Sequence, residues 1–390
     1  MVSYHTVVSK QQLGTVLASR EITRESEEPL EQRSPAAADA GPVRFGVIGA
    51  GWFASRRHIP EMHKSEKIEL AAICRRDPDA REKIRTHFEL GNNQCFEDWR
   101  DMLDTVPLDA VLIATPNDLH FEQASEALDR GINVLLEKPM TIRGEDAWAL
   151  VAKAKALGLQ LSAALNPPFW AHCHRMRRAL RSPEMGKLES ASMYWTGSAT
   201  YVFGKAPAPE NLPGVVPPTS YRSNPDANGG GYFIDGGSHL VSEMLWVTDA
   251  IPKRVFCSMD ETPADMRASL LIEMTNGAIC SINSIGDSEF PSRRVRNIFG
   301  AAGGTITVNG FEFDTTVSVH GREFERFKEE DLPSVPSPVG NFCAAVRGSS
   351  PLYSPAEHGA LVVDLVEGAY CSAATGEAVL LPDRSKEMGR

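Results

Sequence analysis

From residue 43 onward, short apolar runs alternate with longer segments in which apolar residues recur every three or four positions. The first pattern is typical of buried strands, and the second is typical of amphipathic helices. Strands that alternate with helices indicate a doubly wound parallel sheet, the hallmark of an α/β domain. The predicted strands cover 45–48, 68–74, 110–114, 133–136 and 159–165, and the predicted helices cover 54–64, 80–88, 121–130 and 144–158.

After a further predicted helix over 170–180, the pattern changes to strand-like runs that follow one another. Asn276-Gly277 and Asn309-Gly310 are typical of hairpin turns. Consecutive strands favour an antiparallel sheet in a second, α+β domain. Its predicted strands cover 187–195, 254–259, 269–274, 278–284, 294–299, 305–308 and 315–320, and the chain closes with predicted helices over 338–346 and 355–374.

This change of pattern divides the chain into three predicted parts. Residues 1–42 are rich in acidic residues, Ser, Pro and Ala, and we interpret them as a loosely ordered extension without an assigned function. Residues 43–165 form the first domain and residues 166–390 the second. A chain of 390 residues is long enough to bury two such cores.

A glycine-rich turn follows the first predicted strand. Gly49 and Gly51 take the first two places of the pattern G-x-G-x-x-G/A, and Ala54 takes the third. Glycine lets the backbone approach a pyrophosphate, and the partial positive charge at a helix N-terminus favours an anion there. The motif predicts a dinucleotide site, although the pattern alone is shared by many dehydrogenases.

Arg75 and Arg76 directly follow the second predicted strand. NAD(H) sites usually place a carboxylate here to bind the ribose hydroxyls, whereas guanidinium groups bind phosphate in a bidentate manner. The two arginines therefore favour NADP(H) as the cofactor, with NAD(H) still possible. The alternative interpretation is a solvated arginine pair beside Asp77.

Composition and charge exclude several classes of function. The formal net charge of −11, without a long basic block, disfavours nucleic acid as a partner. No apolar stretch reaches the ~20 residues of a membrane-spanning helix. The seven cysteines are scattered without a C-x-x-C pair, and no secretory pattern opens the chain, so we expect a cytoplasmic protein. No metal site is predicted, because the neighbouring residues of His172-Cys173-His174 would point in different directions on a helix.

Three more motifs carry polar groups to strand ends and loops. Lys138 follows the strand 133–136 between Glu137 and Pro139, but taken alone it is equally well a strand end that turns polar. Asp235 and His239 would share one face of a helical turn, unless they are a capping residue and a surface histidine. The turn after 110–114 lies at the edge where doubly wound sheets bind ligands, and it carries Thr115, Pro116, Asn117 and His120.

Together these motifs resemble the Gfo/Idh/MocA oxidoreductases, and the resemblance covers about residues 43–382. It implies an N-terminal Rossmann domain, a C-terminal open-faced and mostly antiparallel sheet domain for substrate binding and oligomerisation, and a homodimer or homotetramer. It also implies NAD(P)-linked oxidation or reduction of a sugar, inositol or related polyhydroxylated small molecule. The motifs that carry it are Gly49-x-Gly51-x-x-Ala54 continuing to His58, Ala114-Thr115-Pro116-Asn117-x-x-His120, Glu137-Lys138-Pro139, and Gly229-Gly230-Gly231 followed by Asp235-x-x-x-His239.

The resemblance further implies a role for individual residues. Lys138 would hold the reacting oxygen, His239 would transfer the hydroxyl proton, and Asp235 would orient His239 or the substrate. It also implies a cis peptide bond between Lys138 and Pro139. Cofactor contacts are expected from Gly49, Gly51, Trp52, Phe53, Ala54, Arg75, Arg76, Thr115, Pro116, Asn117, His120, Glu137, Lys138 and Asn166.

Substrate contacts are expected from Lys138, Asp235 and His239. The loop before them adds Tyr221 and Arg222, with Tyr201 as a further candidate, although packing and solvated charge explain these three residues equally well. The sequence departs from the family pattern at Asn166, which is followed by prolines where many members have an arginine.

The chemistry of these residue types agrees with the implied activity. An imidazole can take or give a hydroxyl proton, and an ammonium group stabilises a developing alkoxide. Because a helix start lowers the pKa of His239 and Asp235 raises it, we expect this pKa to stay near ~6.5. The leading interpretation is NADP(H)-dependent interconversion of a secondary alcohol and a ketone. Two alternatives stay open: glycoside cleavage or elimination with a tightly bound nicotinamide, and a non-catalytic nicotinamide-binding regulator.

Overall fold

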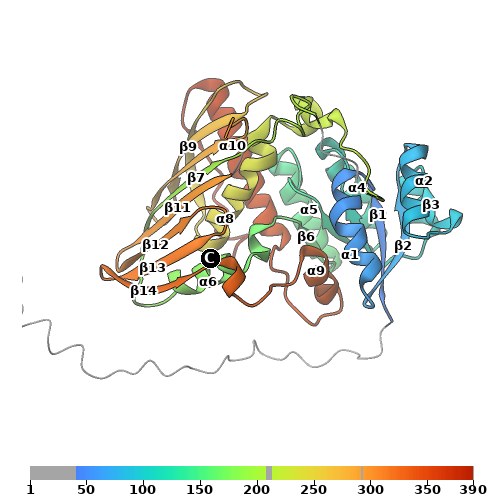
Figure 1. Ribbon diagram of the computed structural model, residues 1–390, viewed down its shortest axis with the longest axis horizontal. Helices are drawn as coiled ribbons and strands as arrows, with labels where there is room; N and C mark the ends of the chain where they lie inside the picture. The colour runs from blue at the N-terminus through green and yellow to red at the C-terminus, as the bar shows by residue number, and fades with distance from the viewer. Residues whose placement is uncertain (1–40, 208–212, 291–292, 390) are drawn as a thin grey trace, which may run out of the picture. The chain divides into compact units, whose positions relative to one another are not determined.

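The computed structural model describes residues 41–207, 213–290 and 293–389. The extension expected at 1–42 therefore lies outside the described residues, except for its last two positions. From Val43 onward the chain builds two sheets, one parallel and one mostly antiparallel (Figure 1). This architecture confirms the predicted fold class.

The first sheet is parallel throughout. Its strands are β1 (Val43–Ile48), β2 (Ile68–Cys74), β3 (Cys95–Phe96), β4 (Ala110–Ile113), β5 (Asn133–Leu136) and β6 (Leu161–Ala163). The helices between them are α1 (Ile59–Lys64), α2 (Pro78–His87), α3 (Trp99–Thr105), α4 (His120–Asp129) and α5 (Gly144–Leu157). The strand order β3-β2-β1-β4-β5-β6 reverses between β1 and β4, which is the switch point where doubly wound sheets bind dinucleotides.

The second sheet has nine strands in the order β14-β13-β12-β11-β7-β10-β9-β8-β15, and within it only β7 and β10 pair in parallel. Its strands are β7 (Leu188–Thr196), β8 (Pro252–Met259), β9 (Arg267–Met274), β10 (Ile279–Ile285), β11 (Arg294–Ala301), β12 (Gly304–Asn309), β13 (Asp314–Val319), β14 (Arg322–Phe327) and β15 (Val379–Leu380). The remaining helices are α6 (Ala171–Leu180), α7 (Pro225–Asn228), α8 (Ser238–Thr248), α9 (Pro338–Val346) and α10 (Ala356–Thr375). In the described ranges no helix has the length and hydropathy needed to cross a bilayer.

One face of the second sheet is packed and the other is open. Alternate residues of β9, β10 and β11 are buried, as the period of two requires. The helix α10 packs on β8, and α8 packs on β7 and β10. On the opposite face, neighbouring strands place in one row the side chains of Phe256, Leu271, Ser281, Ser192 and Ile298. Phe256, Leu271 and Ile298 are exposed, so this face carries apolar surface among hydroxyl groups.

The helix α9 returns to the first sheet. Ser337 caps it by accepting a hydrogen bond from the backbone N–H of Gly340, and Pro338 occupies the first turn. Phe342 is fully buried against β1, with its ring centroid 6.1 Å from that of Phe45. The expected boundary between the two domains, at residues 165 and 166, does not account for α9. This helix lies beyond the boundary in sequence but contributes Val339 and Phe342 to the core of the Rossmann sheet.

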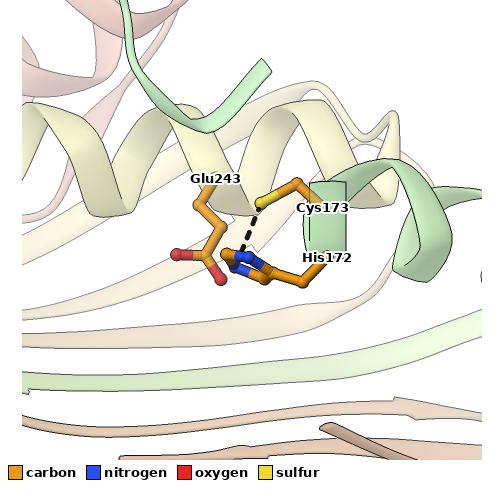
Figure 2. Close-up of side chains that lie close together, drawn as sticks. All are labelled: His172, Cys173 and Glu243. Atoms are coloured by element: carbon orange, nitrogen blue, oxygen red, sulfur yellow. Dashed lines mark hydrogen bonds between the residues drawn. The ribbon is translucent and has the colours of Figure 1, made fainter. Parts of the chain in front are cut away.

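A buried polar cluster lies between α6, α8 and the second sheet (Figure 2). His172, Cys173 and Glu243 bring their polar atoms within 4.8 Å of one another. His172 is hydrogen-bonded through Nδ1 to Glu329, and Glu243 accepts a bond from Nδ2 of Asn297 at 2.9 Å. Burial raises the pKa of Glu243, which favours its neutral form. These bonds tie the helices to the sheet, and the expectation of no metal site stays a prediction.

Candidate active site

The glycine turn after β1 lies directly against the end of β4. Gly49 has a φ of +81°, and a Cβ added there would lie 2.7 Å from the carbonyl carbon of Ala114, so glycine is required. Gly51 lies beside Arg75, whose Nη1 would be 3.1 Å from an added Cβ. The third motif position, Ala54, is buried at the start of a π-helical turn, Ala54–His58, that leads into α1.

A cavity of about 1060 Å³ opens at the carboxyl ends of β1, β2 and β4. We call it the larger cavity. Its position is the crevice where open α/β sheets bind dinucleotides. The residues predicted to bind the cofactor that line it are Gly49, Gly51, Trp52, Phe53, Arg75, Arg76, Thr115 and Pro116.

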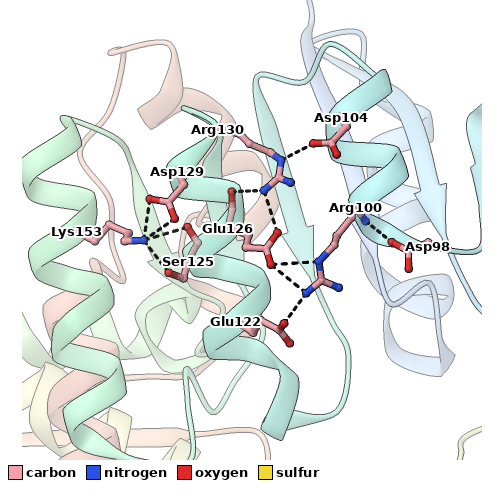
Figure 3. A network of polar contacts seen from close by, with 9 residues as sticks. All are labelled: Asp98, Arg100, Asp104, Glu122, Ser125, Glu126, Asp129, Arg130 and Lys153. Carbon is pink, nitrogen blue, oxygen red and sulfur yellow. Dashed lines mark hydrogen bonds and ion pairs between the residues drawn. The ribbon is translucent and has the colours of Figure 1, made fainter.

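Ion pairs between α3 and α4 hold the rim of the larger cavity (Figure 3). Arg100, which lines the cavity, donates to Glu122 at 2.5 Å and to Glu126 at 3.0 Å. Arg130 joins the same network through Glu126 and Asp104. Single exposed pairs contribute little, but these share a carboxylate and connect two helices, so they fix α3 beside the cavity.

Arg75 presents an unpaired guanidinium group to the larger cavity. Its Nε is buried without a hydrogen-bond partner in the described part of the chain, and burial lowers the pKa of Arg75. The nearby carboxylate of Asp77 is already used, because its Oδ1 accepts a bond from the N–H of Ala80 at 2.8 Å as the cap of α2. Arg76 is exposed. The position after β2 therefore offers two positive charges, and the carboxylate beside them, Asp77, is bonded through Oδ1 as the cap of α2.

Residues 213–222 cross the first sheet domain, and we call them the strap. Lys83 donates from Nζ to the carbonyl of Val215 at 2.7 Å, and the N–H of Val216 donates to Oγ of Ser55 at 3.0 Å. Val216 is buried in the core of the Rossmann sheet. Residues 218–222 of the strap, which include the predicted residue Tyr221, line the larger cavity.

An ion cluster joins β5, the strap and the start of α8. Lys138 donates from Nζ to Oδ1 of Asp235 at 2.7 Å and to its carbonyl oxygen at 2.8 Å. Arg222 donates from Nε to the same Oδ1 at 3.0 Å. Burial alone would raise the pKa of Asp235, but the two cations hold it well below its usual range. An ammonium group has three donors, so Lys138 keeps one for a ligand.

Backbone and buried side chains fix Lys138 in place. Its peptide bond to Pro139 is cis, as predicted. Glu137, the residue before it, forms a 2.6 Å hydrogen bond with Nε2 of His58 in the π-helical turn. Burial opposes ionisation of Glu137, yet His58 and Lys138 lower its pKa overall. The end of β5 is thereby tied to the glycine turn.

Three residues expected at the cofactor line neither the larger cavity nor the smaller cavity that lies at Lys138 and His239. Ala54 is buried in the π-helical turn. Asn117 donates from Nδ2 to the carbonyl of Asn228 at 2.8 Å. His120 places its ring between the carbonyls of Pro139 at 2.9 Å and Thr115 at 3.1 Å. The side chains of Asn117 and His120 thus bond to protein carbonyls, and the expected cofactor contacts of these residues stay predictions.

His239 follows a second π-helical turn, Phe233–Gly237, that runs into α8. Its Nδ1 is buried and has no hydrogen-bond partner within the described residues. Burial, followed by the charge of Lys138, lowers the pKa of His239 to about 3 and outweighs Asp235, so the ring is neutral. The expected value near ~6.5 is wrong because the sequence argument counted charges and the helix end but not desolvation.

A smaller cavity of about 230 Å³ contains these groups. It is below the roughly 300–1,000 Å³ of pockets for drug-sized ligands, so it suits a small molecule. Trp52, Phe53 and Arg222 line both cavities, which therefore adjoin. The other predicted residues that line the smaller cavity are Glu137, Lys138, Asn166, Tyr201, Asp235 and His239.

The walls of the smaller cavity include residues that the sequence did not single out. Trp170 and Trp195 stack with ring centroids 6.5 Å apart and planes inclined by 12°. Tyr232 and Arg293 belong to the same lining. Trp195 lies in β7, whereas the other three directly precede α6, the second π-helical turn and β11, so no motif spacing connects the four residues.

A glycine turn at a Rossmann switch point, beside a small cavity with a lysine and a neutral histidine, defines a nicotinamide-dependent oxidoreductase. The chain belongs to the Gfo/Idh/MocA family. Residues 43–165 match the family model described as "Oxidoreductase family, NAD-binding Rossmann fold", and residues 173–306 match the "GFO/IDH/MocA C-terminal domain".

Several relatives are named as sugar oxidoreductases. The dTDP-3,4-didehydro-2,6-dideoxy-alpha-D-glucose 3-reductase of Saccharopolyspora spinosa is 29% identical over 250 residues, which are 62% of this chain and 68% of that protein. The D-glucoside 3-dehydrogenase of Escherichia coli (strain K12) is 25% identical over 373 residues, 88% and 99% of the two chains. The WlbA dehydrogenase from Bordetella pertussis, solved with NADH and UDP-GlcNAcA, shares the fold with a TM-score of 0.72, 22% identity and coverage of 88% and 99%.

Replacing Asp235 by Asn should lower the free energy of unfolding by about 3–5 kcal/mol, because Lys138 and Arg222 would remain without their carboxylate. Urea denaturation followed by circular dichroism measures the loss. Glu145→Gln is the matched control, since it breaks the exposed pair with Arg143 and should cost less than about 1 kcal/mol. Equal losses in the two variants would contradict a buried ion cluster.

Proposed function

We propose that the protein interconverts a secondary alcohol and a ketone on a sugar, inositol or related polyhydroxylated ring, and that it uses NADP(H). We further propose that oxidation of the alcohol is the favoured direction. The observation that carries this proposal is the pairing of Lys138 with a neutral His239 in one small cavity beside the larger one. Oxidation of an alcohol needs a base for its proton, and a neutral imidazole is one. The relatives named as a 3-reductase and a 3-dehydrogenase of sugars support a ring hydroxyl as the reacting group.

The residues of the larger cavity fit a nicotinamide dinucleotide. Gly49 and Gly51 leave the backbone open to a pyrophosphate. The orphaned, buried Nε of Arg75 fits the additional phosphate of NADP(H), which a guanidinium binds through charge-assisted hydrogen bonds. When bound, the nicotinamide supplies the acceptor for a hydride. NAD(H) remains a second possible cofactor.

In this proposal four polar side chains of the smaller cavity each have a role. Lys138 donates its remaining N–H to the substrate oxygen and stabilises negative charge there as the proton leaves. His239 takes that proton. Asp235 holds the ammonium group of Lys138 in position through two hydrogen bonds, and Arg222 neutralises the carboxylate from the other side. The hydride departs from the ring carbon that carries the hydroxyl.

The strap favours a second candidate function. Because the strap is anchored at Ser55 and Lys83 and its residues 218–222 line the larger cavity, a nucleotide bound there would leave slowly. A retained nicotinamide that is reduced and reoxidised within one turnover would suit glycoside cleavage or elimination. A non-catalytic regulator is less well supported, since such a protein would not need Lys138 and His239 together.

We also propose a homodimer or homotetramer that uses the open face of the second sheet. The exposed side chains of Phe256, Leu271 and Ile298 supply apolar area on adjoining strands. All seven cysteines are free, which supports a cytoplasmic location.

The proposed function predicts that NADPH accumulates when the purified protein meets NADP+ and a suitable member of a panel of polyols and sugars. Nicotinamide absorbance and product analysis by mass spectrometry are the measurements. Product formation without net change in nicotinamide would favour glycoside cleavage instead. No conversion of any sugar, glycoside or inositol in the panel would contradict both candidate functions.

NADPH should bind about ten- to a hundred-fold more tightly than NADH, because Arg75 meets the additional phosphate through charge-assisted bonds. Arg75→Ala should remove most of that difference, whereas Arg76→Ala, at an exposed position, should have a smaller effect. Fluorescence titration of both cofactors measures the affinities. Equal affinities in the unmodified protein would disprove the preference.

His239→Ala should lower turnover by about a hundred- to ten-thousand-fold with little change in cofactor affinity. In the unmodified protein His239 stays neutral above its pKa of about 3, so its protonation should not reduce the oxidation rate between about pH 8 and pH 5. The pH profile of kcat/KM measures this. The contrary result is an inflection of the kcat/KM profile near pH ~6.5. If His239→Ala abolishes this inflection and the control His320→Asn, at an exposed position, keeps it, the pKa of His239 is unperturbed.

A further inference from the structure

The smaller cavity carries an excess of positive side chains, although the whole chain has a formal net charge of −11. Three cations line it, namely Lys138, Arg222 and Arg293. They face two carboxylates, Asp235 and Glu137. The surroundings of a ligand in this cavity are therefore positive, in contrast to the chain as a whole.

Both carboxylates are already committed to other groups. Asp235 accepts hydrogen bonds from Lys138 and from Arg222 through the same oxygen. Glu137 is bonded to His58. Across the described ranges no carboxylate lies within ion-pair distance of Arg293. Among the described residues, Arg293 is thus the one cation of this lining without a carboxylate partner.

Arg293 is held against the aromatic wall. Its guanidinium carbon lies 5.2 Å from the ring centroid of Phe311 and 5.8 Å from that of Trp195. Such cation–π contacts orient a guanidinium but leave its N–H donors at the edge free to bind a ligand. Among the causes that lower the pKa of His239, after burial and the charge of Lys138, is the charge of Arg293. The two groups therefore lie within electrostatic reach of each other.

We propose that the substrate carries an anionic group, a carboxylate or a phosphate, and that Arg293 binds it while the reacting hydroxyl lies at Lys138 and His239. This inference rests on the proposed function, because it names the substrate class of the same cavity. Carboxylate and phosphate share the geometry that a guanidinium recognises with paired hydrogen bonds. A neutral sugar would leave this charge unpaired.

The test compares matched sugars in the NADP+-dependent assay. The probes are D-glucose, D-glucuronate and D-glucose 6-phosphate, together with D-galactose, D-galacturonate and D-galactose 6-phosphate. The glucose probes form one series and the galactose probes another. In at least one series, the unmodified protein should have a kcat/KM for the carboxylate or the phosphate sugar about ten- to a hundred-fold higher than for the neutral sugar. Whichever member does so identifies the anion.

Arg293→Met should remove this preference, because the anionic sugars would lose the guanidinium that binds them. Arg294→Met is the matched control, because the neighbouring Arg294 bonds to Thr196 and Ser288 and does not line the cavity. Raising the ionic strength should weaken the preference in the unmodified protein and in the control. Equal efficiency for neutral and anionic sugars, a preference that survives Arg293→Met, or the same loss in Arg294→Met would each overturn the proposal.

Failure of the proposed function is separable from failure of this inference. If no probe is oxidised, calorimetric titration of the NADP+-loaded protein with D-glucuronate and D-glucose 6-phosphate tests whether Arg293 binds an anionic sugar. Binding that Arg293→Met abolishes and Arg294→Met preserves supports the anion site. Absence of binding, or binding that Arg293→Met leaves unchanged, overturns it.

Discussion

The carboxylate of Asp235 is the constraint on which the rest of the site depends. It lies where three separate parts of the chain meet: the end of β5 through Lys138, the strap through Arg222, and the turn that starts α8. Because both cations bond to one oxygen, any shift of one part displaces the other two. The wall between the two cavities and the position of the ammonium group follow from this single contact.

The same low-dielectric surroundings act in opposite directions on neighbouring groups. Desolvation opposes charge on Asp235 and on His239 alike. Asp235 nevertheless stays ionised because two cations touch it, whereas one of them, Lys138, makes a positive charge on His239 less favourable. The same buried cluster therefore keeps Asp235 ionised and His239 neutral.

The sequence was most informative where a signal is local. Periodicity predicted the bounds of β2 and α9 as the structure has them, and motifs at strand ends identified Gly49, Lys138 and His239 as candidates. The two-residue strand β3 is too short for a period, and the charged pattern of β14 (Arg322–Phe327) conceals a strand at the sheet edge.

The rest of the site depends on distant contacts that a sequence pattern does not encode. Trp195 and Arg293 reach the cavity only because β7 and β11 pair in the folded sheet. Desolvation of His239 likewise results from packing around it. The same limit applies to Asn117 and His120, whose motif predicts a site but whose side chains bond to protein carbonyls within the fold.

The return of α9 to β1 bears on how the chain folds while it is synthesised. Phe45 emerges from the ribosome early, but Phe342, which covers it, follows roughly 300 residues later, or about 15–60 s at about 5–20 residues per second. During that interval one apolar face of the nascent Rossmann sheet lacks its cover. The N-terminal domain cannot complete its core until α9 has been synthesised, and a nascent chain that stops before α9 would offer this face to chaperones.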